Sequence, residues 1–317
     1  MIDAERVLRN SRRPLVIGMG GGGDIVGALA TAEFARRYDG SEPMLGGLAW
    51  ERRPIDPQPG PRTVDEIEHA DELAPGILSA GPETRVRDSH VRFAESRMAE
   101  FLGQPTVLIT LENGPERIAS SLSQVAASLD RDLLVFIDVG GDVLAQGHEP
   151  GLRSPLSDAI MLAVAARLER ADHAVLGGVF GIGCDAELSP AEVLGGLSDL
   201  AGLGALCGAR GLTAEIVQRM EEATRLIPTE ASAQAVQAFT HPAGAVAIRG
   251  GARSIERTAA ATVTFYFDVG LAFENLGRLA QAVDGASSLE EANDALGALG
   301  VRTELDLERD AVRVAAG

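Results

Sequence analysis

The sequence predicts an α/β fold: a three-layer, Rossmann-like domain in which helices cover both faces of a mostly parallel sheet. Apolar runs that are continuous rather than alternating recur along the chain, with helical stretches between them. Such runs are typical of strands buried on both faces of a parallel sheet. The chain has 317 residues and is 45% hydrophobic, so it can bury one large core. We therefore expect a single α/β domain over residues 1–317, whose last third (about 190–317) adds further helices and strands.

Strands and helices alternate through the first two thirds of the chain. The apolar runs predict strands at residues 14–20, 42–50, 105–111, 132–141 and 173–181, and helical stretches follow at 24–38, 114–129 and 154–170. Residues 52–73 contain four prolines, which exclude a central strand or a regular helix in the first half of that segment. We expect a structured loop there.

The last third has a different pattern. Amphipathic stretches predict helices at residues 189–203 and 213–227, and an apolar run predicts a strand at 261–270. Residues 302–314 are predicted to form a pair of terminal strands.

Charge and composition limit the classes of partner. The formal net charge of −18 disfavours nucleic acid and anionic membranes, since both attract basic proteins. The 28 residues counted as lysine and arginine are all arginines, which excludes a Schiff-base lysine and a Walker-type phosphate lysine. The two cysteines and the lack of an apolar leader or membrane-length run indicate a cytoplasmic protein. A homo-oligomer stays open.

Four predicted strands end in glycines that are followed by acidic residues. These acids are Asp24, Glu51, Asp138, Asp142, Asp185 and Glu187. In open parallel sheets, ligands bind in the crevice outside the carboxyl ends of the strands, and glycine allows a ligand to approach the backbone closely. The pattern therefore predicts a small-molecule site with carboxylates around its rim.

The loop after the first strand is the most glycine-rich. Its pattern G-x-G-x-x-G, from residue 18 to residue 23, is that of nucleotide-binding loops. We expect a phosphate or a nucleotide cofactor to bind at the start of the following helix. The residues that would bind it are Gly20, Gly21, Gly22, Gly23 and Asp24. In the alternative interpretation Asp24 only caps that helix, and Glu51 fits the spacing of a dinucleotide site loosely.

Residues 137–163 hold the densest group of polar side chains. Asp138, Asp142 and Glu149 are candidate ligands of a divalent cation, Mg²⁺ or Mn²⁺, because hard cations bind carboxylate oxygens. Asp138 and Asp142 are also candidate catalytic residues, with Glu51 or Asp185 as the general base. In the competing interpretation these acids cap helices, pair with arginines or bind sugar hydroxyls.

Further residues stand near the predicted site. Arg249 and Arg253 flank two glycines and form a candidate anion clamp for the ligand or cofactor. Trp50 either stacks on a ligand ring or closes the core. Asp158 is expected in the first turn of its helix, where it interacts with the helix dipole. Cys184 has no histidine placed to activate it, so we do not expect a thiolate nucleophile.

Four stretches of the chain resemble a known family. They read GGGGDIVGALATA, GGLAWERRPIDPQPGPR, DVGGDVLAQGHEPGLRSPLSDAI and GIGCDAELSPAEV. They resemble an archaeal and actinobacterial family catalogued as domain of unknown function 1152. The resemblance extends from about residue 14 to residue 268 and implies a single unit, but no particular reaction.

Three functions agree with these observations. The first is an enzyme that hydrolyses, or transfers a group from, a phosphorylated or nucleoside-like small molecule with the help of a divalent cation. The second is an NAD(P)-dependent oxidoreductase whose first loop binds the dinucleotide. The third is a protein that binds a metabolite without catalysis. A co-purified nicotinamide cofactor would support the second, and loss of turnover on substitution of Asp138 or Asp142 would support the first.

Overall fold

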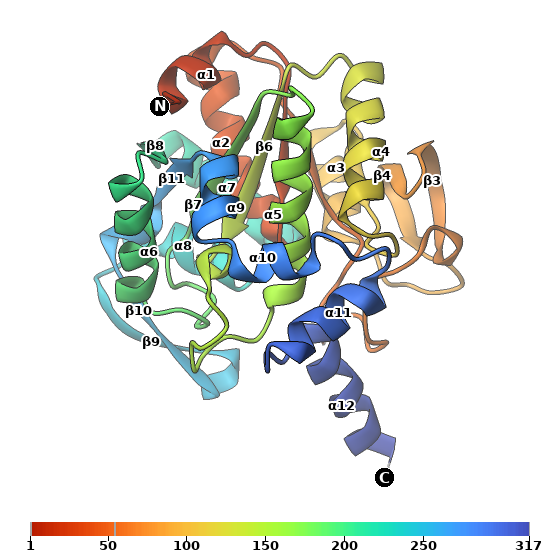
Figure 1. Ribbon diagram of the computed structural model, residues 1–317. Coiled ribbons are helices and arrows are strands. Elements are labelled where there is room, and N and C mark those ends of the chain that lie inside the picture. Colours follow the sequence, from red (N-terminus) through yellow and green to blue (C-terminus); the bar gives the residue numbers. More distant parts are fainter. Residues whose placement is uncertain (1, 54, 317) are drawn as a thin grey trace.

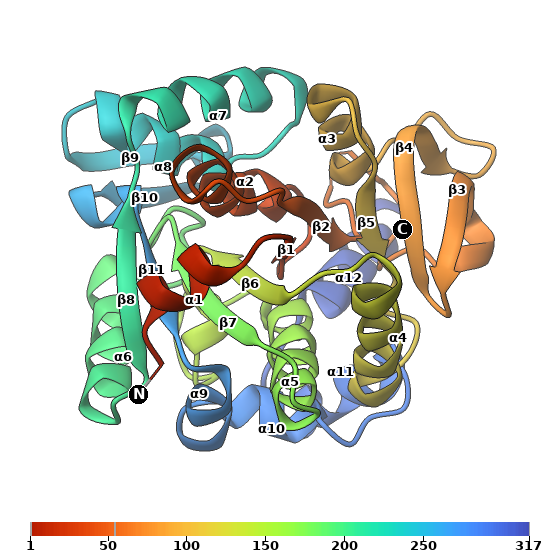
Figure 2. The same ribbon diagram turned by 90° about the horizontal axis from the view of Figure 1, so that it is seen from above.

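The computed structural model describes residues 2–53 and 55–316, and Figures 1 and 2 show it from two directions. Within these residues nine strands form one sheet, in the order β3-β4-β5-β2-β1-β6-β7-β11-β8, and β9 and β10 form a separate hairpin. The strands are β1 Pro14–Gly18, β2 Met44–Leu48, β3 Ile67–Ala74, β4 Ile77–Val86, β5 Thr106–Ile109, β6 Leu133–Val139, β7 Val175–Phe180, β8 Leu206–Gly211, β9 Gly244–Ile248, β10 Arg253–Arg257 and β11 Val263–Phe267.

The centre of the sheet is parallel. Strands β5, β2, β1, β6 and β7 pair in parallel, while β4 and β11 are antiparallel to their neighbours. The α/β fold with a mostly parallel sheet is therefore confirmed. Every residue of β1, β6 and β7 is buried, which explains why these strands read as continuous apolar runs.

The order of the strands reverses beside β1. After β1 the chain builds one side of the sheet with β2 to β5, and then adds β6 and β7 on the other side of β1. The carboxyl ends of β1 and β6 therefore flank a topological switch point, the position at which open α/β sheets bind ligands.

Helices cover both faces of the sheet. Helices α2, α3 and α7 lie on one face, and α4, α5, α9 and α10 lie on the other (Figure 2). The helices are α1 Ala4–Asn10, α2 Asp24–Phe34, α3 Ala94–Leu102, α4 Pro115–Ser128, α5 Pro155–Arg170, α6 Pro190–Gly202, α7 Ala214–Leu226, α8 Ala231–Thr240, α9 Val269–Asn275, α10 Arg278–Val283, α11 Leu289–Ala298 and α12 Glu304–Ala316. Among the described residues, none of the helices is both long and apolar enough to cross a bilayer.

The predicted strand pair at residues 302–314 is wrong, because this segment forms helix α12. The hydroxyl of Thr303 accepts the Asp306 N–H at 3.3 Å, and the Asp306 carboxylate accepts the Thr303 N–H at 3.3 Å. This reciprocal capping starts a helix. Leu305 and Glu308, three residues apart, are both buried, as expected for one face of a helix. Helix α12 lies at the bottom of Figure 1, where α5 begins.

The prediction of a loop over residues 52–73 is wrong in its second half. Strand β3 begins at Ile67 and pairs with β4 at the edge of the sheet. Its side chains are largely half-buried or exposed, so its sequence lacks the continuous apolar run of a central strand. The first half is a structured loop, in which the buried Arg62 donates to Asp56 at 2.8 Å.

Candidate functional site

A cavity of about 820 Å³ opens at the switch point. Its wall is made by the loops after β1, β2, β6 and β7, by the first turns of α5 and α8, and by one face of α12. The volume is typical of small-molecule sites, which range over roughly 300–1,000 Å³. Segments that are far apart in the sequence therefore converge where the topology predicts a ligand.

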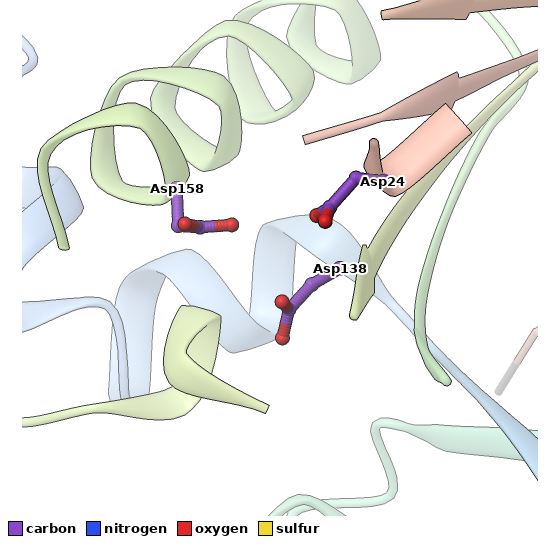
Figure 3. A group of neighbouring side chains, drawn as sticks. All are labelled: Asp24, Asp138 and Asp158. Carbon is purple, nitrogen blue, oxygen red and sulfur yellow. The ribbon is translucent and has the colours of Figure 1, made fainter. Parts of the chain in front are cut away.

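Three aspartates face one another beside this cavity (Figure 3), and two of them, Asp24 and Asp158, line it. Asp24 is the first residue of α2, Asp138 lies near the end of β6, and Asp158 lies in the first turn of α5. One carboxylate oxygen of each lies within 4.8 Å of those of the other two. Oδ1 of Asp138 and Oδ1 of Asp158 are buried, and neither has a hydrogen-bond partner among the described residues. We call these three residues the open cluster.

A second group of acids, Asp142, Asp185 and Glu187, lies beside the first, and its oxygens also fall within 4.8 Å of one another. Here the chain itself supplies donors. Glu187 accepts the N–H of Arg153 at 2.6 Å, and both the N–H and the hydroxyl of Ser154, at 2.7 and 2.5 Å. Asp185 accepts the Glu187 N–H at 3.1 Å. We call this group the closed cluster.

Burial and mutual repulsion disfavour the charged forms of these acids. Burial raises the pKa of Asp138 to about 7. Burial, followed by repulsion from Asp138, raises the pKa values of Asp24 and Asp158 well above their usual range. The pKa of Asp142 is raised in the same way, by burial and then by Asp158. A cation between these carboxylates would remove the repulsion and allow several of them to ionise together.

Helix α12 positions the helix that carries Asp158. Leu156 and Ser157 lie in the first turn of α5. The carboxylate of Glu304 accepts hydrogen bonds from their backbone N–H groups, at 3.0 Å each. These donors have no partner within their own helix, so a carboxylate satisfies them well. Arg52 lies 3.4 Å from Glu304 and 4.2 Å from the centre of the Trp50 ring. The beginning of α5 is thereby fixed from the C-terminal end of the chain.

The glycines at the strand ends make room for the acids. A methyl group on Gly20 would lie 2.4 Å from Oδ2 of Asp24, and one on Gly140 would lie 2.4 Å from Oδ2 of Asp185. Gly22 has a φ of +67°, a conformation that favours glycine. Much of the glycine content thus serves contacts within the protein.

Two N–H groups of the glycine loop are already used within the protein. Gly20, Gly21 and Gly22 line the cavity, but the Gly20 N–H donates to Asp24 at 3.0 Å and the Gly22 N–H donates to the Trp50 carbonyl at 2.9 Å. Gly23 packs against Thr229, and a Cβ atom added to Gly23 would lie only 2.7 Å from the Cβ atom of Thr229. Asp24 is the first residue of α2, after the cap residue Gly23, so it does not act as the N-cap.

Two candidates that follow β2 do not line the cavity. Glu51 is buried and accepts the Ala94 N–H at 2.5 Å, at the start of α3. Trp50 is fully buried, and its indole N–H donates to Glu308 at 3.1 Å. The expected roles of Glu51 as a general base and of Trp50 as a stacking platform therefore do not fit their positions. Trp50 closes the core.

Glu149 also lies apart from the two clusters. Its carboxylate accepts the backbone N–H groups of Gln146, Gly147 and His148 at 2.7, 2.8 and 3.0 Å. These bonds hold the loop between β6 and α5 in shape. Its carboxylate is therefore not placed to share a cation with Asp138, whereas the carboxylates of Asp24 and Asp158 lie beside Asp138.

The remaining candidates have mixed outcomes. Arg253, on β10, lines the cavity, and its Nη1 lies 3.5 Å from the Ala186 carbonyl. The side chain of Arg249, the other member of the predicted anion clamp, lies outside the described residues. Burial raises the pKa of the Cys184 thiol to about 12, which keeps it protonated and agrees with the expectation of no nucleophile.

The sequence indicates some residues of the candidate site only weakly. Asp158 belongs to the group of acids at residues 137–163, but an interaction with its helix dipole explains it equally well, and Arg153 is expected there only as a partner of acids. The signal for Asp158 is its place three residues after Pro155, in the first turn of α5. Glu304 offered no such signal, because its segment was predicted as a strand.

The model of the family described as protein of unknown function (DUF1152) matches residues 15–312. The chain belongs to this family. The part of the chain shared with the DUF1152 family runs from β1 into α12 and includes every residue of both clusters. Among curated proteins, none matches the chain.

Proposed function

We propose that this DUF1152 protein is an enzyme that binds Mg²⁺ or Mn²⁺ and hydrolyses, or transfers a group from, a phosphorylated small molecule. The open cluster is the observation that supports this proposal. It offers three carboxylates from three elements, and two buried oxygens that have no partner among the described residues. Carboxylate oxygens are the protein ligands that these cations prefer, and buried oxygens rarely stay without a partner.

The cavity is suited to this chemistry. A divalent cation there would neutralise a phosphate and lower the pKa of a bound water. Asp24, Asp138 and Asp158 would hold the cation. Asp185 lines the cavity beside them and is the remaining candidate for the base that takes a proton from water. Since the chain has no lysine, positive charge at the phosphate would come from the cation and from arginines.

The alternative of an NAD(P)-dependent oxidoreductase has less support. The acid that would bind the ribose, at the end of β2, is Glu51, and its carboxylate is buried against α3. Asp24 places a carboxylate where the pyrophosphate would meet the start of α2. A protein that binds a metabolite without catalysis would use the same cavity, and only turnover separates it from an enzyme.

Calorimetric titration with Mn²⁺, followed by phosphate release from a panel of phosphate esters, tests the proposal. We expect Mn²⁺ to bind the wild type, and Asp138→Asn to lose both binding and turnover. Asp199→Asn, an exposed aspartate of α6, is the matched control and should retain both. Absence of Mn²⁺ binding to the wild type would refute the proposal. Binding without turnover would favour the metabolite-binding alternative.

A further inference from the structure

The arginines that line the cavity differ in whether their guanidinium groups already have partners in the protein. Four arginines line it: Arg52, Arg53, Arg153 and Arg253. Arg52 is engaged with Glu304 and with the Trp50 ring. Arg53 and Arg153 are exposed, and their guanidinium groups make no hydrogen bond or ion pair with the residues that the structure describes. Arginine in such a position is suited to bind a carboxylate or a phosphate in bidentate fashion.

Arg153 and Arg253 belong to the same side of the cavity. The Arg153 N–H donates to Glu187 at 2.6 Å, and the Arg253 guanidinium reaches the carbonyl of Ala186, the preceding residue, at 3.5 Å. Both arginines therefore adjoin the turn that carries Asp185 and Glu187 of the closed cluster. Asp24 and Asp158 of the open cluster line the same cavity as Arg153. One extended ligand can therefore reach both the open cluster and Arg153.

The rest of the lining is suited to hydroxyl groups rather than to a flat base. Among the described residues that line the cavity, none is aromatic, whereas bases are commonly bound by stacking on aromatic rings. The polar lining between the clusters and α8 includes Ser154, Thr229 and Gln234, which can exchange hydrogen bonds with hydroxyl groups.

We infer that the substrate is a non-aromatic, hydroxyl-bearing molecule with two separated anionic groups, a phosphate and a second anion. The phosphate lies at the cation held by the open cluster, and the second anion is bound by Arg153. This inference rests on the proposed function for the position of the cation. It narrows the substrate class to phosphorylated sugar acids and similar compounds, and it disfavours a ligand whose base needs an aromatic ring to stack on.

A matched pair of probes isolates the second anion. 3-Phosphoglycerate carries a carboxylate where glycerol 3-phosphate carries a hydroxymethyl group, and both have the same phosphate. With Mn²⁺ at saturation, we expect 3-phosphoglycerate to bind about tenfold more tightly, the gain of one charge-assisted hydrogen bond. AMP should bind no more tightly than glycerol 3-phosphate, because the lining offers its base no ring to stack on.

Arg153→Gln tests the residue itself. We expect it to bring the affinity for 3-phosphoglycerate down to that for glycerol 3-phosphate and to leave Mn²⁺ binding unchanged. Arg117→Gln, an exposed arginine of α4, is the control and should keep the tenfold preference. The inference is overturned if the two probes bind equally to the wild type, if the preference survives in Arg153→Gln, or if AMP binds most tightly. If Mn²⁺ still binds normally in any of these cases, the proposed cation site stands. If the wild type does not bind Mn²⁺, both the proposed function and this inference are refuted.

Discussion

The open and closed clusters each consist of three acidic residues, but they differ in their hydrogen bonding. Each brings three carboxylates within 4.8 Å. In the closed cluster, Glu187 alone accepts three hydrogen bonds from Arg153 and Ser154. In the open cluster, one oxygen of Asp138 and one of Asp158 have no partner among the described residues. A cluster of acidic residues therefore does not by itself identify a cation site. It is more informative to ask which of the buried carboxylate oxygens accept a hydrogen bond from the chain.

The two clusters also serve different segments. Glu187 ties the turn after β7 to the residues that precede α5, so it contributes to the fold. The open cluster joins the starts of α2 and α5 to the end of β6. Carboxylates repel one another in both clusters, but only the open cluster holds buried oxygens without a partner among the described residues. We therefore expect substitutions in the closed cluster to reduce stability, and substitutions in the open cluster to reduce cation binding.

The largest effect is expected from Glu187→Ala. Removing its carboxylate leaves the two N–H groups and the Ser154 hydroxyl without their acceptor, which should lower the free energy of unfolding by about 3 kcal/mol. Urea denaturation without added metal measures this change. Glu187→Gln keeps an acceptor oxygen and should lose less. Equal stability of Glu187→Ala and the wild type would show that the closed cluster is not structural.

The next largest effect concerns the cation. At one hundred times its dissociation constant, Mn²⁺ should stabilise the wild type by about 2.7 kcal/mol. Asp158→Asn should lose this stabilisation, because it removes a ligand of the open cluster. Glu187→Gln should keep it relative to its own metal-free state. Thermal denaturation with and without Mn²⁺ measures both, and the reverse result would exchange the roles of the clusters.

A pair of buried acids, Glu51 and Glu95, extends the comparison outside the cavity. Burial raises the pKa of Glu51 from 4.5 to about 7, and burial, followed by repulsion from Glu51, raises the pKa of Glu95 well above its usual range. Oε2 of Glu95 is also without a partner among the described residues. These two acids can simply stay protonated. They show that an unpartnered buried oxygen does not by itself indicate a cation.

The pH dependence of stability tests whether Glu51, of this pair, stays protonated in the folded protein. Because the folded state binds the proton of Glu51 more tightly than the unfolded chain does, its contribution is fully present below pH 4.5 and is lost as the pH rises to about 7. Glu51→Gln should match the wild type at pH 4.5 and exceed its stability at pH 8 by about 3 kcal/mol, since one pKa unit corresponds to about 1.4 kcal/mol. Urea denaturation at both pH values measures this gain. A gain that depends on Mn²⁺ would place Glu51 at the cation site after all.

The sequence predicts the centre of the fold better than its edges. The buried strands β1, β5, β6 and β7 are recognisable because both faces of each strand are apolar. Strand β3 is not, since it lies at an edge and carries polar residues on its exposed side. Helix α12 was predicted as strands, although Thr303 and Asp306 have the spacing of a capping box.

The candidate site is predictable only as far as strand ends determine it. The rule that ligands bind at the carboxyl ends of strands predicts the positions of Asp24, Asp138 and Asp142 at one edge. It fails for Glu51, whose side chain turns toward the start of α3. It also cannot find Glu304, which reaches α5 from 147 residues away in the sequence. The direction of a side chain and such long-range contacts depend on packing, which a local pattern does not contain.

The smallest predicted effect has the opposite sign to the first. In the metal-free protein Asp158 is a buried acid that faces two other carboxylates and has an unpartnered oxygen. Asn at this position has nearly the same shape, carries no charge and can donate a hydrogen bond to Asp24 or Asp138. Asp158→Asn should therefore stabilise the metal-free protein at pH 7 by about 1 kcal/mol, as is common where a residue is kept for function rather than for stability. Urea denaturation in the presence of a chelator measures this, and Asp199→Asn, with no expected change, is the control. If Asp158→Asn destabilised the metal-free protein as Glu187→Ala is expected to, the open cluster would be structural too, and the distinction between the clusters would be lost.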